Sequence, residues 1–302
     1  MRKKTAVLIG CLVLLGISVQ LLGAHSARSL LSPAHAATEE IDFKHIINLA
    51  GRERMLSQKM SKEFLLIALG YNARENLRNL KYSRETFARV LKGLRFGDAD
   101  LELQSVNDST IHAKLSRVEE LWPEYETLLQ DDAGKEQVPA ESVAAVAELR
   151  LPLLAAMHDA VNAYEELDNR RSKAFSLVDH LVNIAGRQRM LTQKMSTEYL
   201  LIVYGHEVPA NREKLASTMA MFEKYLTALI VGDSGERIIA APTPRIRSQL
   251  RAVERLWQEF KPMMEAALQG KEIDRDALAD MASLNVTLLT EMDNAVDLYE
   301  AN

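Results

Sequence analysis

The chain contains little of what builds cross-links and tight turns. Its 302 residues include one cysteine, 13 glycines and 8 prolines, and only 6% of them are aromatic. One cysteine excludes a disulfide framework, and so few glycines and prolines exclude a collagen-like chain and argue against a turn-rich sandwich or barrel. The hydrophobic fraction of 47%, with 12 methionines, is too high for a disordered chain. This composition favours long helices that pack on a core.

The chain also lacks an excess of positive charge. Lys and Arg number 37 against 42 Asp and Glu, which gives a formal net charge of −5. Four of the basic residues and no acid lie in residues 1–36, so the remainder of the chain carries a net charge of −9. A protein that binds nucleic acid presents a basic field to the phosphates. The sequence therefore predicts no nucleic-acid partner.

Only the N-terminus carries a long apolar run. Basic residues 2–4 precede an apolar stretch over residues 6–22, and residues 34–36 read Ala-His-Ala. This order is typical of a secretory signal peptide, so we predict a signal over 1–36 and a periplasmic chain that begins near Ala37. Two alternatives stay open. One is an uncleaved membrane anchor, because the run nears the roughly 20 residues that span a bilayer, and the other is lipidation of Cys11.

The remaining chain is a tandem repeat with an offset of 135 residues. Residues 45–70 and 180–205 are identical at 17 of 26 positions. The alignment continues without a gap, so that Phe87 matches Phe222 and Trp122 matches Trp257. Self-similarity over such a period indicates two copies of one folding unit. We predict two domains, at 37–170 and 171–302.

Each copy is predicted to form four helices with short connections, an arrangement that favours an antiparallel four-helix bundle. Helix starts are marked by Asn72, Thr243 and Asp274 as caps and by Pro209 in a first turn. No glycine or proline interrupts residues 165–173, so the fold class is all-α, with two tandem bundles that one long continuous helix could join. The expected helices are 41–70, 72–95, 109–131 and 140–170 in the first copy and 173–204, 209–231, 243–269 and 274–300 in the second.

The first helix of each copy carries two stripes where a surface helix needs one. The first stripe is apolar and suits the core of its own bundle, although Glu53 interrupts it. The second stripe recurs at the spacing of a helix pair, so we expect the two first helices to pack on each other. It consists of Ile47, Gly51, Arg54, Gln58, Ser61 and Leu65, and of Val182, Gly186, Arg189, Gln193, Ser196 and Leu200.

This pairing would bring Arg54 and Arg189 together across a pseudo-twofold axis, with Gly51 and Gly186 allowing the backbones to approach closely. No carboxylate lies in the stripe, so the two guanidinium groups would repel each other unless an anion joined them. Charge-assisted hydrogen bonds to a small planar oxyanion contribute about 1.5–3 kcal/mol each. The alternative is that both arginines reach water or pair with acids from other helices.

A third face of the first helices is mostly polar, and its default interpretation is a solvated surface. Recurrence of the same residues in both copies weakens that default. The face consists of His45, Asn48, Arg52, Lys59 and Glu63, repeated as His180, Asn183, Arg187, Lys194 and Glu198.

Residues 47–57, Ile-Asn-Leu-Ala-Gly-Arg-Glu-Arg-Met-Leu-Ser, and their repeat at 182–192 resemble the P box of the periplasmic sensor domain of nitrate/nitrite sensor histidine kinases. They are more similar still to the PilJ-like N-terminal domain of type IV pilus methyl-accepting chemotaxis transducers. The resemblance implies a four-helix ligand-sensing domain that binds nitrate or nitrite where two first helices meet. By position it assigns the anion to Arg54 and Arg189, close to the backbone of Gly51 and Gly186.

Two departures limit the resemblance. The residues after the motif follow the PilJ-like pattern and not the kinase one, so a small anion is a safer prediction than nitrate. Receptors of the family also continue into a second membrane span and signalling modules, whereas this sequence stops at Asn302, so signalling is expected to need a partner such as a membrane receptor or sensor kinase. The full predicted ligand site is Arg54, Arg189, Gly51, Gly186, Asn48, Asn183, Gln58 and Gln193.

Two classes of function remain. The first is a periplasmic protein that binds or senses a small anion such as nitrate or nitrite, as an intramolecular pseudo-dimer or as a homodimer. The second is a helical adaptor without a small ligand, serving a membrane receptor, a histidine kinase or a type IV pilus or chemosensory apparatus. An enzyme is the weakest class, since the sequence has no nucleophile elbow, phosphate loop or HExxH pattern. We predict no catalytic residues, no metal site and no cofactor.

Overall fold

The computed structural model describes residues 41–172 and 176–302, so the signal expected over 1–36 lies outside the described residues. The described part of the chain is helical, with two isolated β-bridges and no strand, which confirms the all-α prediction. None of these helices is long and apolar enough to cross a membrane. The helices are α1 (Phe43–Ala68), α2 (Ala73–Phe96), α3 (Ser109–Ala133), α4 (Ala140–Ser172), α5 (Leu177–Tyr204), α6 (Val208–Val231), α7 (Pro244–Leu268) and α8 (Arg275–Glu300), with a 3-10 turn, η1 (Ala99–Leu101), after α2.

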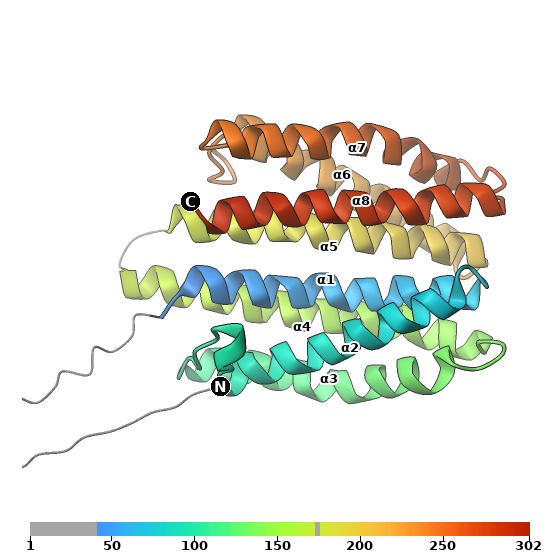
Figure 1. Cartoon of the computed structure of the whole chain (residues 1–302), viewed down its shortest axis with the longest axis horizontal. Helices are drawn as coiled ribbons and strands as arrows, with labels where there is room; N and C mark the ends of the chain where they lie inside the picture. Colours follow the sequence, from blue (N-terminus) through green and yellow to red (C-terminus); the bar gives the residue numbers. More distant parts are fainter. Residues whose placement is uncertain (1–40, 173–175) are drawn as a thin grey trace, which may run out of the picture. The chain divides into compact units, whose positions relative to one another are not determined.

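Each repeat folds as an antiparallel four-helix bundle. In the first, α1 packs against α2 and α4, and α3 packs against α4; α5 to α8 repeat this arrangement. The two bundles meet through α1 and α5, which run side by side in the same direction (Figure 1). The two first helices therefore pair within one chain.

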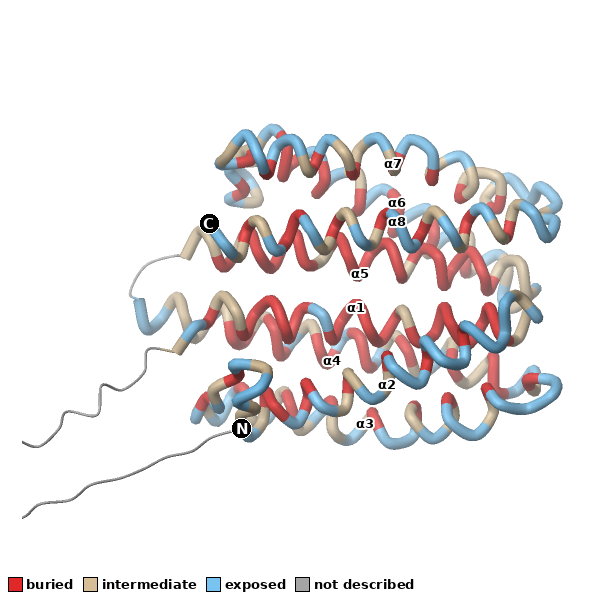
Figure 2. The backbone as a smooth tube through the Cα atoms, viewed as in Figure 1, coloured by how far each residue is buried: buried red, intermediate tan, exposed pale blue. Residues whose placement is uncertain are grey.

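The central helices are buried on both predicted faces (Figure 2). The apolar stripe of α1 packs in its own bundle, and the second stripe faces α5. Every residue of that second stripe is buried in both copies, which confirms the predicted seam. We call these two stripes, with α1 and α5 in contact along them, the seam.

The link between the bundles differs from the continuous helix that the sequence allowed. Helix α4 ends at Ser172, and α5 begins after Ser176, whose backbone is extended at φ −77° and ψ 103°. The Ser176 side chain accepts a hydrogen bond from the backbone N–H of Asp179 at 3.3 Å. This N-cap starts a new helix, so the chain can reverse and lay α5 beside α1. The expectation of one long helix is wrong.

The other helix starts follow local capping chemistry. Thr243 and Asp274 accept hydrogen bonds from the backbone N–H groups of Ile246 and Ala277, and Pro209 lies in the first turn of α6, all as predicted. Asn72 makes no side-chain cap bond and instead takes a left-handed conformation with φ 42°. Asn72 thus occupies the predicted N-cap position of α2 but caps the helix without its side chain, and its backbone turns the corner between α1 and α2.

Candidate functional site

The two seam arginines converge beside the two seam glycines. Arg54 and Arg189 are 0% exposed. A β-carbon placed on Gly51 would lie 3.2 Å from Nη2 of Arg54 and 3.7 Å from Nη2 of Arg189, and one on Gly186 would lie 3.3 Å and 3.7 Å from Nη2 of Arg189 and Arg54. The missing side chains thus leave the space that the guanidinium groups fill. The sequence predicted this meeting on a pseudo-twofold axis.

Each arginine crosses the seam to an asparagine of the other repeat. Nη2 of Arg54 donates to Oδ1 of Asn183 at 2.8 Å, and Nη2 of Arg189 donates to Oδ1 of Asn48 at 2.7 Å. The structure therefore brings both asparagines into contact with the arginines, and their binding of a ligand stays a prediction. Their amide nitrogens donate to carboxylates of Glu165 and Glu300, so each asparagine links an arginine to a carboxylate.

Behind each asparagine stands a carboxylate–histidine pair. Glu165 bonds Nδ1 of His180 at 2.7 Å, and Nε2 of His180 lies 3.0 Å from the carbonyl oxygen of Glu236. Carboxylate and carbonyl oxygens only accept, so both ring nitrogens donate and the ring is an imidazolium. Burial opposes that charge, but the bonds to Glu165 and to the Glu236 carbonyl raise the pKa of His180.

The first repeat carries the same arrangement. His45 bonds Glu300 at 2.8 Å and the carbonyl oxygen of Leu101 at 2.9 Å. Most of the polar third face is therefore not a solvated surface, which was its default interpretation: its histidines and asparagines are hydrogen-bonded to α4, α8 and the loops after α2 and α6. Arg52, whose side chain is 47% exposed, is the exception in the first repeat. Of its members, Asn48, Glu63, Asn183 and Glu198 are at most 5% exposed.

The arginines differ at their other guanidinium nitrogen. Nη1 of Arg189 donates to Oδ1 of Asp293 at 2.6 Å. At the equivalent position of the first repeat, Nη1 of Arg54 lies 3.3 Å from Nδ1 of His158. Burial, and then the cations of Arg54 and Arg187, lower the pKa of His158 to about 4, so its ring is neutral at pH 7. Pairing with an acid from another helix, one of the alternatives, is correct for Arg189; in the described part of the chain, no carboxylate lies within 4 Å of Arg54.

The site is electropositive. Only one carboxylate, that of Asp293, is bonded directly to either guanidinium cation, and Glu165 acts on Arg54 from beyond Asn183. The Nε atoms of both arginines are buried without a hydrogen-bond partner among the described residues. Burial, followed by the cations of Arg187 and Arg189, lowers the pKa of Arg54 to about 9, which still leaves it charged at pH 7. Burial also lowers the pKa of Arg189. An anion placed here would gain both charge and unused donors.

The two predicted glutamines lie one helical turn away from the arginines and bind other residues. Gln58 accepts from Nη1 of Arg150 at 2.8 Å and donates to its carbonyl oxygen at 3.2 Å. Gln193 donates to Oδ1 of Asn285 at 3.1 Å. Both are fully buried. The structure thus brings together the arginines, glycines and asparagines of the predicted set, and places the glutamines in a separate polar layer of the seam.

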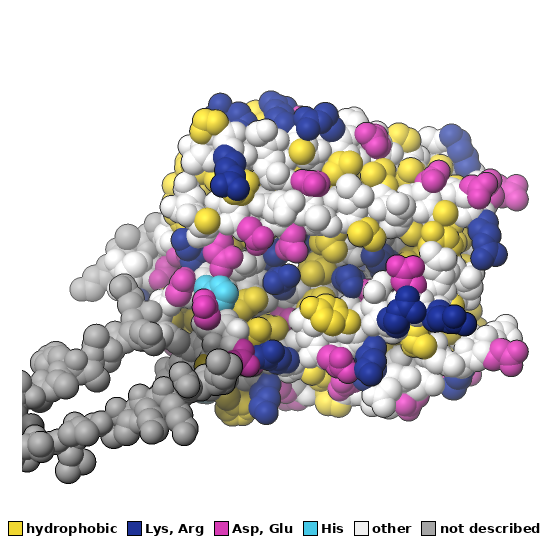
Figure 3. Space-filling view, in the orientation of Figure 1, with side chains coloured by type: hydrophobic (Ala, Val, Ile, Leu, Met, Phe, Trp, Pro, Cys, Tyr) yellow, Lys and Arg dark blue, Asp and Glu magenta, His cyan; other side chains and the backbone are white. Residues whose placement is uncertain are grey.

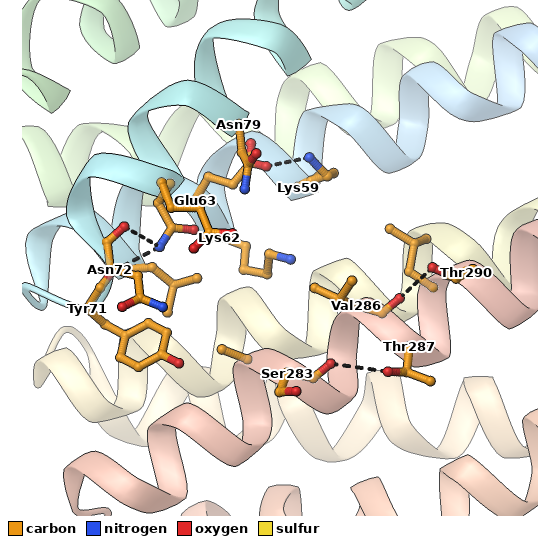
Figure 4. A pocket seen from close by; sticks show the side chains of 15 residues that line it. Lys59, Lys62, Glu63, Tyr71, Asn72, Asn79, Ser283, Val286, Thr287 and Thr290 are labelled. Carbon is orange, nitrogen blue, oxygen red and sulfur yellow. Dashed lines mark hydrogen bonds and ion pairs between the residues drawn. The ribbon is translucent and has the colours of Figure 1, made fainter.

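Two cavities border the seam. One, of about 320 Å³, lies between α4, α5 and α6, and Arg54 and His158 are among its lining residues. The other, of about 600 Å³, lies between α1, α2 and α8. Figure 4 shows the Lys62 side chain reaching into the space between α1 and residues 283–290 of α8. Lys62 is 5% exposed and donates to Oδ1 of Asn285 at 2.7 Å, and burial lowers its pKa to about 8.

Sequence reasoning missed the residues that the other helices supply. Asp293, His158, Glu165 and Glu300 come from α8 and α4, and no local spacing relates them to α1 or α5. The alignment of the repeats does pair Glu165 with Glu300, but that match alone does not place them beside the first helices. His158 and Asp293 also align, but differ in type, so only contact with the arginines reveals their importance.

The surroundings of the site hold no metal-binding arrangement. Within residues 41–172 and 176–302, no three His, Cys, Asp or Glu side chains are grouped so as to hold a metal ion. On the face drawn in Figure 3, basic and acidic side chains lie interspersed, with apolar patches between them.

Comparison with known proteins gives consistent matches. The family model described as "Type IV pili methyl-accepting chemotaxis transducer N-term" (PilJ) matches residues 42–149 and 178–281, one match in each repeat. The methyl-accepting chemotaxis protein McpN of Pseudomonas aeruginosa (strain PAO1) is 30% identical over 129 residues, which cover 42% of this chain and 23% of McpN. The chain therefore spans about a quarter of that relative.

A solved structure gives a further match. It is the ligand-binding domain of the P. aeruginosa nitrate receptor McpN, 29% identical, covering 40% of this chain and 94% of that domain with a TM-score of 0.37. The family match covers most of both repeats, including each first helix with its Gly-x-x-Arg seam. The chain is a member of the PilJ family of type IV pili methyl-accepting chemotaxis transducer N-terminal domains.

Proposed function

We propose that this protein binds a small oxyanion, nitrate or nitrite, in the periplasm, and that Arg54 and Arg189 hold the anion between them. The observation that carries the proposal is a fully buried pair of guanidinium groups of which only one, that of Arg189, is bonded to a carboxylate. Buried cations without counter-charge are costly. A bound anion would offset that cost.

The geometry suits a planar ligand of small size. Guanidinium groups present fixed N–H forks that match planar oxyanions, and the glycines give both forks room to lie side by side between α1 and α5. The asparagines fix the direction of each fork from the opposite helix. The anion would thus enter a preorganised site, which reduces the ordering cost of binding.

Relatives support the same assignment. The ligand-binding domain of McpN carries the description of a nitrate receptor, and the family contains chemotaxis transducers. Because a ligand shifts a conformation only through different affinities for two states, a sensing role requires a protein that reads the relative position of the two bundles. We propose a membrane receptor or sensor kinase as that partner.

The test is the rise in melting temperature with added nitrate or nitrite, since a ligand that binds only the folded chain stabilises it. Wild type is expected to show a saturable rise. Arg54→Gln and Arg189→Gln should lose it, while Arg117→Gln, a change at an arginine paired with Glu120 on the surface, should keep it. Arg54→Lys, which retains the charge without the fork, should retain only part of it.

An equal nitrate-dependent rise in wild type and Arg54→Gln would overturn the proposal. So would the absence of any rise with either anion in wild type. In that case the adaptor function would remain, with the seam as a structural contact.

A further inference from the structure

The cavity beside Arg54 is larger and more apolar than a simple oxyanion needs. Its volume is about 320 Å³, within the range of about 300–1,000 Å³ typical of small-molecule sites. Liquid water occupies about 30 Å³ per molecule, so a four-atom oxyanion would leave most of the cavity to water. Apolar side chains from three helices form much of its wall: Leu151, Leu154, Met190, Leu191 and Met221.

The polar part of the cavity is cationic. Arg54 and Arg187 both line it. Nε of each is buried and has no hydrogen-bond partner among the described residues. Arg187 lies over the ring of Tyr225 at 5.2 Å, and within the described chain no carboxylate approaches it to 4 Å. The third cation, Lys194, is already paired with Glu198 at 2.5 Å.

In the second repeat, the equivalent pair of arginines has a carboxylate beside it. There Asp293 bonds Arg189 at 2.6 Å and lies 3.7 Å from Nη2 of Arg52, the equivalent of Arg187. One carboxylate thus neutralises the pair of arginines on that side. In the first repeat, the neutral His158 takes the position of Asp293, so neither Arg54 nor Arg187 is paired with a carboxylate of the described chain.

From this difference we propose that the cavity lined by Arg54, Arg187 and His158 binds a small organic monocarboxylate. The ligand carboxylate would take the place that Asp293 occupies in the other repeat, bridging Arg54 and Arg187. Its apolar substituent would lie against Leu154 and Met190. The inference rests on the proposed anion-binding role of Arg54 and extends the ligand class beyond nitrate and nitrite.

The mouth of the cavity fits this ligand class. Met221 is 41% exposed and lines the cavity. An exposed apolar side chain beside one buried and one half-buried arginine suits a ligand that has one charged and one apolar end. The equivalent residue of the first repeat is Thr86. A Met221→Thr change is therefore tolerated by the fold of the repeat and removes apolar contact without removing charge.

The experiment is calorimetric titration of the purified chain with benzoate and, separately, with nitrate at constant ionic strength. Benzoate is expected to bind wild type saturably. Arg187→Gln should weaken benzoate binding roughly tenfold or more, the effect of one lost charge-assisted hydrogen bond, while the matched variant Arg52→Gln should change it less than about twofold. His158→Asp, which copies the second repeat, should abolish it.

Met221→Thr separates the apolar contribution from the charge. It should weaken benzoate binding and leave nitrate binding unchanged. Wild type that binds nitrate but gives no saturable heat with benzoate would overturn this inference and leave the proposed function intact. Benzoate binding that is equal in wild type and Arg187→Gln would also overturn it. Benzoate binding as expected, with no binding of nitrate or nitrite, would support the cavity and overturn the proposed oxyanion ligands.

Discussion

At the scale of single residues, the two equivalent arginines have different neighbours. Asp293 stands 30% exposed against the buried Arg189, whereas His158 gives Arg54 a neutral neighbour. The carboxylate of Asp293 occupies a donor that an anion could use. Asp293 is the counter-ion of the buried Arg189, and if an anion binds here as proposed, this carboxylate would compete with it.

Removing that carboxylate should therefore have opposite effects on folding and binding. We expect Asp293→Asn to lower the free energy of unfolding by roughly 1–3 kcal/mol, less than a fully buried pair because Asp293 is partly exposed. The same variant should bind nitrate roughly tenfold more tightly. Denaturant unfolding and calorimetry measure the two quantities, and weaker nitrate binding in the variant would contradict the competitor role.

The seam glycines allow a second test at this scale. A β-carbon at Gly51 would lie 3.2 Å from Nη2 of Arg54, close enough to displace the guanidinium but not the backbone. Gly51→Ala should raise helix stability by up to about 1 kcal/mol and yet weaken nitrate binding. Gly134, where a β-carbon meets nothing within 4 Å, provides the control. Unchanged affinity in Gly51→Ala would show that the anion does not need the arginines at this spacing.

Glu53 offers a test by pH. It is 0% exposed, and neither carboxylate oxygen has a hydrogen-bond partner among the described residues. Burial raises its pKa well above the usual 4.5. The equivalent residue is Gln188, also fully buried, which resembles a protonated glutamate in shape. A neutral carboxyl in the core thus explains the polar interruption of the apolar stripe.

The free energy of unfolding of the wild type should fall as pH rises above about 4.5, because the unfolded chain then releases a proton that the folded chain retains. Glu53→Gln has no proton to release. Its melting temperature should exceed that of the wild type at about pH 8, and the difference should shrink as the pH is lowered towards about 4. A difference that does not vary with pH would contradict a raised pKa for Glu53.

At the scale of elements, two buried cations lie next to the seam, on different helices. Lys62 on α1 bonds Asn285 on α8. Thr197 on α5 is the equivalent of Lys62, and Arg150 on α4 is the equivalent of Asn285. Each pair therefore contains one cation and one small polar residue, but the cation comes from the first helix in one pair and from the fourth helix in the other. Arg150 bonds Gln58 and lies 3.9 Å from Glu198.

This exchange predicts a rescue. Asn285→Arg alone should place a second cation beside Lys62 and lower the free energy of unfolding. Adding Lys62→Thr should recover most of that loss, because the double variant has the same residue pair as Thr197 and Arg150. The coupling energy between the two changes should be about 0.5–3 kcal/mol, measured by denaturant unfolding. Asn285→Arg combined with Lys135→Thr, at a lysine that is 51% exposed, is the control and should show none.

Some features of the helices could be predicted from the sequence and others could not. The seam was predictable because α1 and α5 carry two stripes, and the spacing of the second matches a helix pair. The start of a separate helix at α5 was not predictable, because it depends on the Ser176 cap in a stretch of sequence without glycine or proline. Partners such as Glu300, which is 255 residues from His45, depend on the packing of α8 on α5, which local periodicity does not specify.

At the scale of the whole molecule, two repeats in one chain pair as two separate subunits could. In a homodimer, both arginines would have identical surroundings by symmetry. Because both copies lie in one chain, the surroundings of the two arginines can differ. They do differ beside the guanidinium groups, where His158 contacts Arg54 and Asp293 contacts Arg189. The single chain can therefore hold one open and one neutralised half-site.

The proposed site holds one anion inside a single chain, between the two repeats. Calorimetric titration with nitrate, combined with the mass of the protein in solution with and without ligand, tests this stoichiometry. We expect saturable binding of one nitrate per chain while the protein remains a monomer. One nitrate for every two chains, or binding that appears only with a dimer, would contradict the intramolecular pairing of Arg54 and Arg189.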